Sequence, residues 1–242
     1  MILSCEVLKL RKIVICNLYL FLNIFYYRHK LYMEYLHHKV SNENLLLIFK
    51  DSEERSIFIH TYPYFGDDNN NEFYQAFINA NILSKNAKKQ EDAIELSLVT
   101  AYFKPLYLEV IAFIIYSRKT FWIKLLCLDW LFEFSGMIPG ETYRSLNIHA
   151  SKANNELLKL QSLANLLLSG QSEDLTKQLS KLLTHSKNPA VFYRLAHGLT
   201  DVLVNNISKK AIEEFIPMIN ENAYLTEKQK IELAKIYYEL SE

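Results

Sequence analysis

Apolar residues recur at three- and four-residue steps through most of the C-terminal half of the chain. Between residues 173 and 203, the leucines from 175 to 183 fall on one side of a helix, and polar residues fill the other side. Asn188-Pro189 then interrupts the pattern, because the residue before proline disfavours the helical region and proline suits the first turn of a new helix. This segment therefore predicts two short amphipathic helices joined by a tight turn.

Similar helix pairs are predicted on both sides of this segment. Helices are expected to start near residues 154, 174, 189, 209 and 226. Every second start recurs after roughly 35 residues, a period typical of two-helix repeats. None of these helices is long enough to be stable alone, so each needs a neighbour.

This period and pattern resemble those of HEAT-like α-solenoids, and the tetratricopeptide and ankyrin signatures are absent. The resemblance implies an all-α fold of stacked antiparallel helix pairs. An irregular helical bundle with evenly sized helices is the alternative.

The most apolar part of the chain precedes these pairs. Residues 93–116 and 121–134 are apolar on most sides, so we expect them in the middle of a stack, covered on both faces. Pro105 is expected to start or kink a helix. Residues 141–152 are expected to form either a short helix or an irregular linker.

The region before residue 93 is less regular. Residues 42–65 fit either a helix from about 43 to 60 or a hairpin with strands at 45–49 and 56–61, and the helical sequence downstream favours the helix. A loop is predicted at 66–71 and a helix at 72–83. The polar segment 86–92 is expected to be exposed. It divides an N-terminal helical part, 33–92, from a helical-repeat domain, 93–242.

Residues 1–32 form a separate apolar N-terminal segment. The run 13–27 is flanked by basic residues and is shorter than the about 20 residues of a membrane-spanning helix. It fits a helix packed on the domain, a membrane or export segment without a clear cleavage pattern, or an extension before a true start at Met33. We therefore expect a cytoplasmic protein, with membrane association through residues 13–27 as the alternative.

Composition narrows the class of protein. Half of the residues are hydrophobic, and five glycines and five prolines are few for the length, which favours helices. The 27 basic and 27 acidic residues give no net charge, so no nucleic-acid partner is predicted. Cys5, Cys16 and Cys127 lack metal-ligand spacing, which is typical of a reducing compartment, and Cys127 is expected to be a buried, unreactive thiol.

No motif in the sequence indicates catalysis. Ser-His-Asp spacing, a phosphate-binding glycine loop and a zinc signature are all absent. Residues 67–72, DDNNNE, are similar to the aspartate-rich motif of terpene synthases, which implies magnesium and a diphosphate. Asn205, Ser208 and Glu213 do not match the second metal motif of that family, so a polar loop is favoured. We predict no enzyme, no cofactor and no metal.

The chain contains 16 tyrosines and 14 phenylalanines, and aromatic side chains are enriched in binding hot spots. The candidate binding residues near the last helix pairs are Tyr193, Glu213, Glu214, Tyr237 and Tyr238. The sequence therefore predicts a non-catalytic protein that binds another protein through an exposed surface. By fold-level analogy, such a protein resembles an immunity-type inhibitor of a toxin. The alternatives are a membrane-associated protein anchored by residues 13–27 and an enzyme with an unmarked site.

Overall fold

The computed structural model describes residues 42–65, 71–170, 172–199, 207 and 209–241, and across these ranges the secondary structure is helical, without a strand. The predicted all-α class is therefore confirmed. The chain divides into two compact units, Met1–Tyr102 and Phe103–Glu242, here called unit 1 and unit 2. The apolar run 13–27, the alternative start at Met33 and the aspartates of the DDNNNE loop lie outside the described residues.

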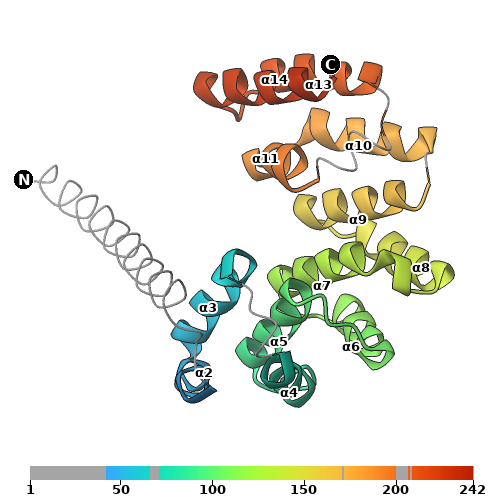
Figure 1. Cartoon of the computed structure of the whole chain (residues 1–242). Helices are drawn as coiled ribbons and strands as arrows, with labels where there is room; N and C mark the ends of the chain where they lie inside the picture. Colours follow the sequence, from blue (N-terminus) through green and yellow to red (C-terminus); the bar gives the residue numbers. More distant parts are fainter. Residues whose placement is uncertain (1–41, 66–70, 171, 200–206, 208, 242) are drawn as a thin grey trace, which may run out of the picture. The chain divides into compact units, whose positions relative to one another are not determined.

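Unit 1 contains the helices α2 (Asn42–Lys50), α3 (Ser52–Phe65), α4 (Asn71–Asn81) and α5 (Ala87–Val99) (Figure 1). The choice between helix and hairpin at 42–65 is thus decided for helix, although two helices replace the single one expected. Asp51 separates them: its Oδ1 accepts hydrogen bonds from the backbone N–H groups of Glu53 (2.8 Å) and Glu54 (3.0 Å). These bonds satisfy donors in the first turn of α3 and favour a new helix start.

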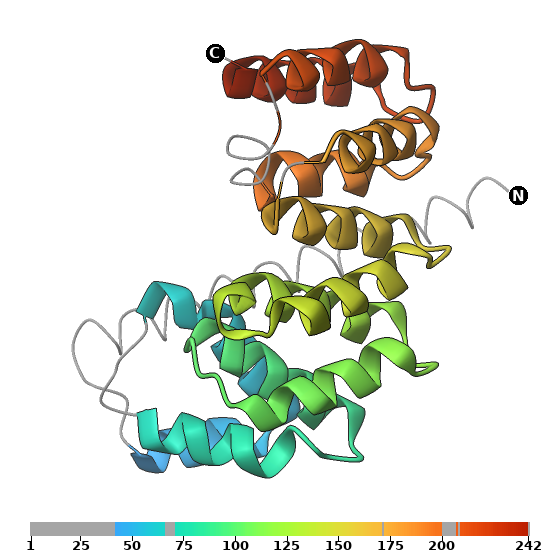
Figure 2. The ribbon, with the colours of Figure 1, turned by 90° about the vertical axis from the view of Figure 1, so that its right-hand side faces the viewer.

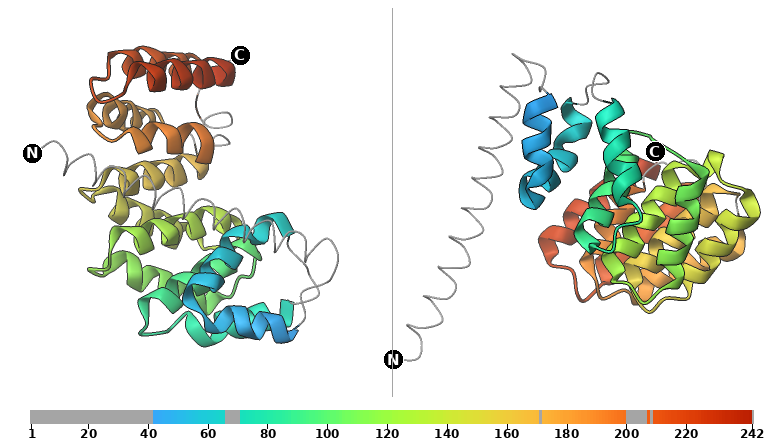
Figure 3. Two further views of the ribbon diagram at one scale, coloured as in Figure 1. Left: turned by 90° about the vertical axis from the view of Figure 1, so that its left-hand side faces the viewer. Right: turned by 90° about the horizontal axis from the view of Figure 1, so that it is seen from below.

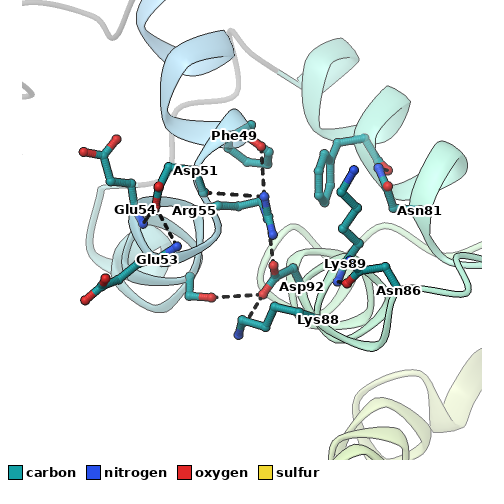
Figure 4. Close-up of polar contacts among 12 residues, drawn as sticks. Phe49, Asp51, Glu53, Glu54, Arg55, Asn81, Asn86, Lys88, Lys89 and Asp92 are labelled. Atoms are coloured by element: carbon teal, nitrogen blue, oxygen red, sulfur yellow. Dashed lines mark hydrogen bonds and ion pairs between the residues drawn. The ribbon is translucent and has the colours of Figure 1, made fainter.

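A buried ion pair joins α3 to α5 (Figure 4). Arg55 Nε donates to Asp92 Oδ2 at 2.7 Å, and both side chains are almost completely buried. Arg55 Nη1 also donates to the carbonyl of Phe49 at 2.9 Å, at the end of α2. The second oxygen of Asp92 accepts from Ser56 Oγ (3.1 Å) and pairs with Lys88 Nζ (3.1 Å). Three helices are therefore held by one guanidinium and one carboxylate.

Asp92 also corrects the expected domain boundary. Segment 86–92 was expected to be exposed and to separate two domains. Residues 86–89 are exposed, but Asn86 caps α5, and Gln90 and Asp92 are buried inside unit 1. The expected division at residue 92 therefore falls within a helix. The division between the two compact units lies instead at Tyr102, after α5 has ended.

Unit 2 begins with helices that flank the predicted break at residues 135–140. Pro105 occupies the first turn of α6, as expected. Residues 141–151 lie in a regular helix, α8, and Lys152 caps it, so the irregular linker that was the alternative is not formed. Later helices start at residues 156, 173, 189, 209 and 227, close to the expected positions. The elements are α6 (Pro105–Tyr116), α7 (Phe121–Glu133), the short 3-10 helix η2 (Ser135–Met137), α8 (Gly140–Ser151), α9 (Glu156–Leu168), α10 (Glu173–His185), α11 (Pro189–Gly198), α13 (Lys209–Glu221) and α14 (Glu227–Ser241).

The helices of unit 2 pack in two rows. In one row α7 packs on α9, α9 on α11 and α11 on α14; in the other, α6 packs on α8 and α10 on α13. Figure 1, Figure 2 and the left panel of Figure 3 show successive levels from α6 and α7 up to α13 and α14. Assignment of these pairs to HEAT-like repeats stays a prediction.

The centre of unit 2 is α9, which is covered from residue 157 to residue 167 except at Lys159. Its buried amides are satisfied from neighbouring helices. Asn165 Nδ2 donates to the Leu128 carbonyl of α7 and to Asn147 Oδ1 of α8, both at 2.9 Å. Gln161 Oε1 accepts from Arg194 Nε of α11 at 3.0 Å, and Arg194 also pairs with Asp129 of α7. One helix therefore fixes the positions of three others.

The turns at one edge of unit 2 are joined to one another. Ser186, after α10, donates its hydroxyl to Glu156 Oε2 at the start of α9 (2.7 Å). Asn222, after α13, donates Nδ2–H to the Ser186 carbonyl (3.0 Å). Hydrogen bonds thus join the turns of successive helix pairs, and they fix the position of each pair relative to the preceding one.

One packing expectation is wrong. Residues 93–116 and 121–134 were expected to be covered on both faces. Helix α7 is covered along most of its length, except at Trp122 near its start and Glu133 at its end, but α6 is not. Its Ile111, Ile114 and Ile115 are buried, whereas Leu106, Phe113 and Tyr116 are exposed. Because α6 is the first helix of unit 2, no earlier pair of that unit covers its outer face.

The buried ion pair of unit 1 yields a stability prediction. Asp92→Ala leaves the Arg55 guanidinium buried without its carboxylate, which should lower the free energy of unfolding by about 3–5 kcal/mol. Lys88→Ala removes only the half-exposed partner of Asp92 and should have little effect. Urea unfolding followed by far-UV circular dichroism measures both variants.

The two tryptophans, Trp122 and Trp130, are both in unit 2, so their fluorescence shows separately whether that unit stays folded. Equal unfolding midpoints for the two variants would contradict the assigned role of the ion pair.

Candidate protein-binding surface

The outer face of α6 carries a row of exposed apolar side chains. Leu106, Phe113 and Tyr116 are separated by seven and three residues, so they share one face of the helix. Phe113 is 69% exposed and Tyr116 is 53% exposed. Isolated exposed apolar residues are ordinary, but a row of them that includes two aromatic rings is a candidate for an interaction surface.

The row continues from α6 onto α8. The Tyr116 ring lies 4.4 Å, between centroids, from the ring of His149. Tyr116 and His149 line an open hollow of about 420 Å³ together with Ile148, Arg144 and Lys152. Glu141 and Ser145 complete its lining. The hollow thus combines apolar and aromatic walls with two cations.

A second hollow adjoins the first and shares His149 and Lys152 with it. It measures about 210 Å³ and is lined at its base by apolar side chains of α6, α7 and α9, with Lys124 of α7 as another cation. Aromatic residues and arginine are enriched at protein interfaces. We call the exposed face of α6 and these two hollows the α6–α8 surface: Leu106, Phe113, Tyr116, Lys124, Arg144, Ile148, His149 and Lys152.

The residues predicted to bind a partner lie elsewhere, on α11, α13 and α14. Tyr193 is half-buried, donates its hydroxyl to Glu232 Oε2 of α14 at 3.1 Å and stacks on His197 of its own helix. Partial burial and the Glu232 carboxylate raise the pKa of Tyr193. This tyrosine therefore joins α11 to α14, with its ring at the surface.

The four other predicted residues differ in exposure. Tyr237 is completely buried and donates its hydroxyl to the Phe192 carbonyl at 3.3 Å, so its side chain is not available to a partner and the prediction is wrong for this residue. Tyr238, Glu213 and Glu214 are exposed. No hydrogen bond or ring contact between described residues joins any two of the five, so the structure does not gather them into one site.

Candidate reactive groups were also located. Cys127 is buried in α7, as expected, and burial raises the pKa of its thiol. Across the described ranges, no three His, Cys, Asp or Glu side chains are grouped so that they could hold a metal ion. None of the described helices has both the length and the apolar content needed to cross a membrane.

Comparison with known proteins found no matching family model, no matching curated protein and no matching solved structure.

Sequence reasoning missed the α6–α8 surface because α6 is apolar on nearly every side. Such a pattern does not distinguish a helix covered on both faces from one covered on a single face. The exposed Glu109, between Leu106 and Phe113, was a weak signal of an outward side. Tyr237 and Tyr238 present a similar difficulty. Adjacent helical residues point in directions about 100° apart, so the two rings have different surroundings, and the local sequence does not indicate which one is buried.

These adjacent tyrosines provide a matched stability test. Tyr237→Ala removes a buried ring that contacts Phe215 and should lower the free energy of unfolding by about 3–5 kcal/mol. Tyr238→Ala changes an exposed side chain and should stay within about 0.5 kcal/mol of the parent protein. Urea unfolding followed by tryptophan fluorescence measures the stability of unit 2. Equal losses of unfolding free energy in the two variants would contradict the burial of Tyr237 and the exposure of Tyr238.

Proposed function

We propose that unit 2 is a non-catalytic protein-binding module and that the α6–α8 surface is its contact site. The exposed aromatic row on α6 carries this proposal. Phe113 and Tyr116 expose large rings beside Ile148, and Arg144 and Lys152 border them. Tyrosine, phenylalanine and arginine supply much of the binding energy at interfaces, where apolar rings are buried at the centre and charges lie around them.

The position of this surface at the start of unit 2 also supports the proposal. In the row of α7, α9, α11 and α14, each helix packs on the next one, and α9 meets both α7 and α11. Within unit 2 the outer face of α6 lacks such a neighbour, yet it has the apolar composition of a covered face. A partner protein supplies the missing cover.

An immunity-type inhibitor of a toxin is a specific form of this proposal, supported by fold-level analogy alone. Its test is genetic and biochemical. If the gene immediately upstream encodes a toxin, co-expression of this protein should restore growth, and the two proteins should co-purify. A harmless upstream product, or a toxin that this protein neither binds nor neutralises, would remove this form and leave the broader proposal intact.

Phe113→Ser tests the contact site itself. The full-length protein, used as bait in a lysate of its source cells, should retain a stoichiometric partner that mass spectrometry can identify. Loss of a hot-spot ring typically costs at least about 2 kcal/mol, so Phe113→Ser should weaken binding of that partner by about 30-fold or more.

Ile231→Ser is the matched control, because Ile231 is 72% exposed and lies on α14 at the other end of unit 2. It should leave binding unchanged, and both variants should unfold like the parent protein because both positions are exposed. A partner that binds the Phe113 variant normally, or is lost with the Ile231 variant, would contradict the proposed site.

A further inference from the structure

Five cations of unit 2 surround adjacent hollows without forming ion pairs. Lys124, Arg144, Lys152, Lys159 and Lys181 line three hollows, and in the described part of the chain none of the five lies within ion-pair distance of a carboxylate. Other cations of unit 2 do form such pairs: Lys177 with Glu173, Arg194 with Asp129, Lys230 with Glu227 and Lys235 with Glu239. The three hollows are therefore lined by five cations that have no ion-pair partner among the described residues.

The third hollow arises from a local irregularity in the packing. Helix α10 packs on α9 but not closely on α8, so a notch of about 450 Å³ remains between the end of α8 and α10, with α9 as its floor. Lys159 of α9 and Lys181 and His185 of α10 supply its basic groups, and Leu163 and Leu182 supply apolar wall. Neighbouring residues of the α8–α9 turn line both sides: Ser151 and Asn154 line this notch, and Lys152 and Ala153 line the second hollow.

The acidic groups along the same path are few. Glu141 lies in the first hollow and Glu156 in the third, and Glu156 already accepts the Ser186 hydroxyl at 2.7 Å. Five cations thus face two carboxylates. The path therefore favours a negatively charged partner, and its apolar walls favour one that also carries apolar side chains.

We infer that the partner of unit 2 docks an acidic polypeptide segment along the path from the α6–α8 surface to the α8–α10 notch. Its carboxylates meet the five cations, and its apolar side chains enter beside Ile148, Leu163 and Leu182. This inference rests on the proposed function and specifies the chemistry of the partner.

A peptide fits this path better than a nucleic acid does. The chain has no net charge, whereas nucleic-acid binding needs a broad basic surplus. Glu141 and Glu156 can accept hydrogen bonds from the N–H groups of a peptide backbone, whereas a phosphodiester group has no donor to offer them.

Selection from a library of displayed random peptides tests the inference without the native partner. The full-length protein is the target, and enriched peptides are synthesised with a fluorescent label and measured by anisotropy. We expect an excess of aspartate and glutamate, interspersed with apolar residues. The double variant Lys159→Glu/Lys181→Glu should weaken binding at least about tenfold at low salt and less at high salt, because salt screens exposed charges.

Lys177→Glu/Lys235→Glu is the charge-matched control, because both lysines are exposed and lie outside the path. It should bind the selected peptides like the parent protein. Failure to enrich any peptide, enrichment of peptides without excess acid, or equal losses in the two double variants would overturn the inference. Binding of single-stranded RNA or DNA through Lys159 and Lys181, in place of acidic peptides, would overturn it as well.

The two proposals can fail separately. Acidic peptides that bind through Lys159 and Lys181, in a protein with no partner dependent on Phe113, would support the path and remove the proposed contact site. A partner whose binding requires Phe113 but not Lys159 or Lys181 would support the proposed contact site and remove the acidic-peptide path.

Discussion

The structure of unit 2 depends on the need to satisfy polar atoms inside its central helix. Helix α9 is enclosed by neighbours, yet it carries Gln161 and Asn165 among its leucines. A buried amide without partners costs about 1–3 kcal/mol, so each must meet a donor or acceptor from another helix. Asn165 reaches α7 and α8, and Gln161 reaches α11. Leucines alone would permit several rotations of α9, whereas these hydrogen bonds fix one.

The polar network of α9 reaches the protein surface at Asp129. Burial raises the pKa of its carboxyl, and the neighbouring Arg194 opposes that shift. Because Arg194 also donates to Gln161, the half-exposed ion pair is continuous with the buried amides. The Arg194–Asp129 pair is therefore the surface end of this series of hydrogen bonds, where water can solvate part of its charge.

In unit 1, a buried ion pair takes the place of the buried amides in fixing how the helices pack. The buried Arg55 guanidinium bonds to Asp92 and to the Phe49 carbonyl, and it lies 5.6 Å from the centroid of the Phe77 ring. Removal of one partner from a buried pair costs more than the intact pair contributes, so the pair specifies geometry more than it adds stability. It requires α3, α5 and the end of α2 to meet at one point, which helix propensity alone would not achieve.

The sequence by itself determined the helical class and most of the helix boundaries in unit 2. Apolar period, Asn and Ser caps, and Pro105 and Pro189 act within a few residues, so they can be recognised without coordinates. Only the tertiary structure decided which faces remain uncovered. Tyr237 and Tyr238 are equivalent in local sequence, but packing on α11 buries one and exposes the other. Likewise, α6 resembles a helix covered on every side, and its place at the start of unit 2 makes it a surface. Exposure depends on neighbours distant along the chain, which local sequence patterns do not specify.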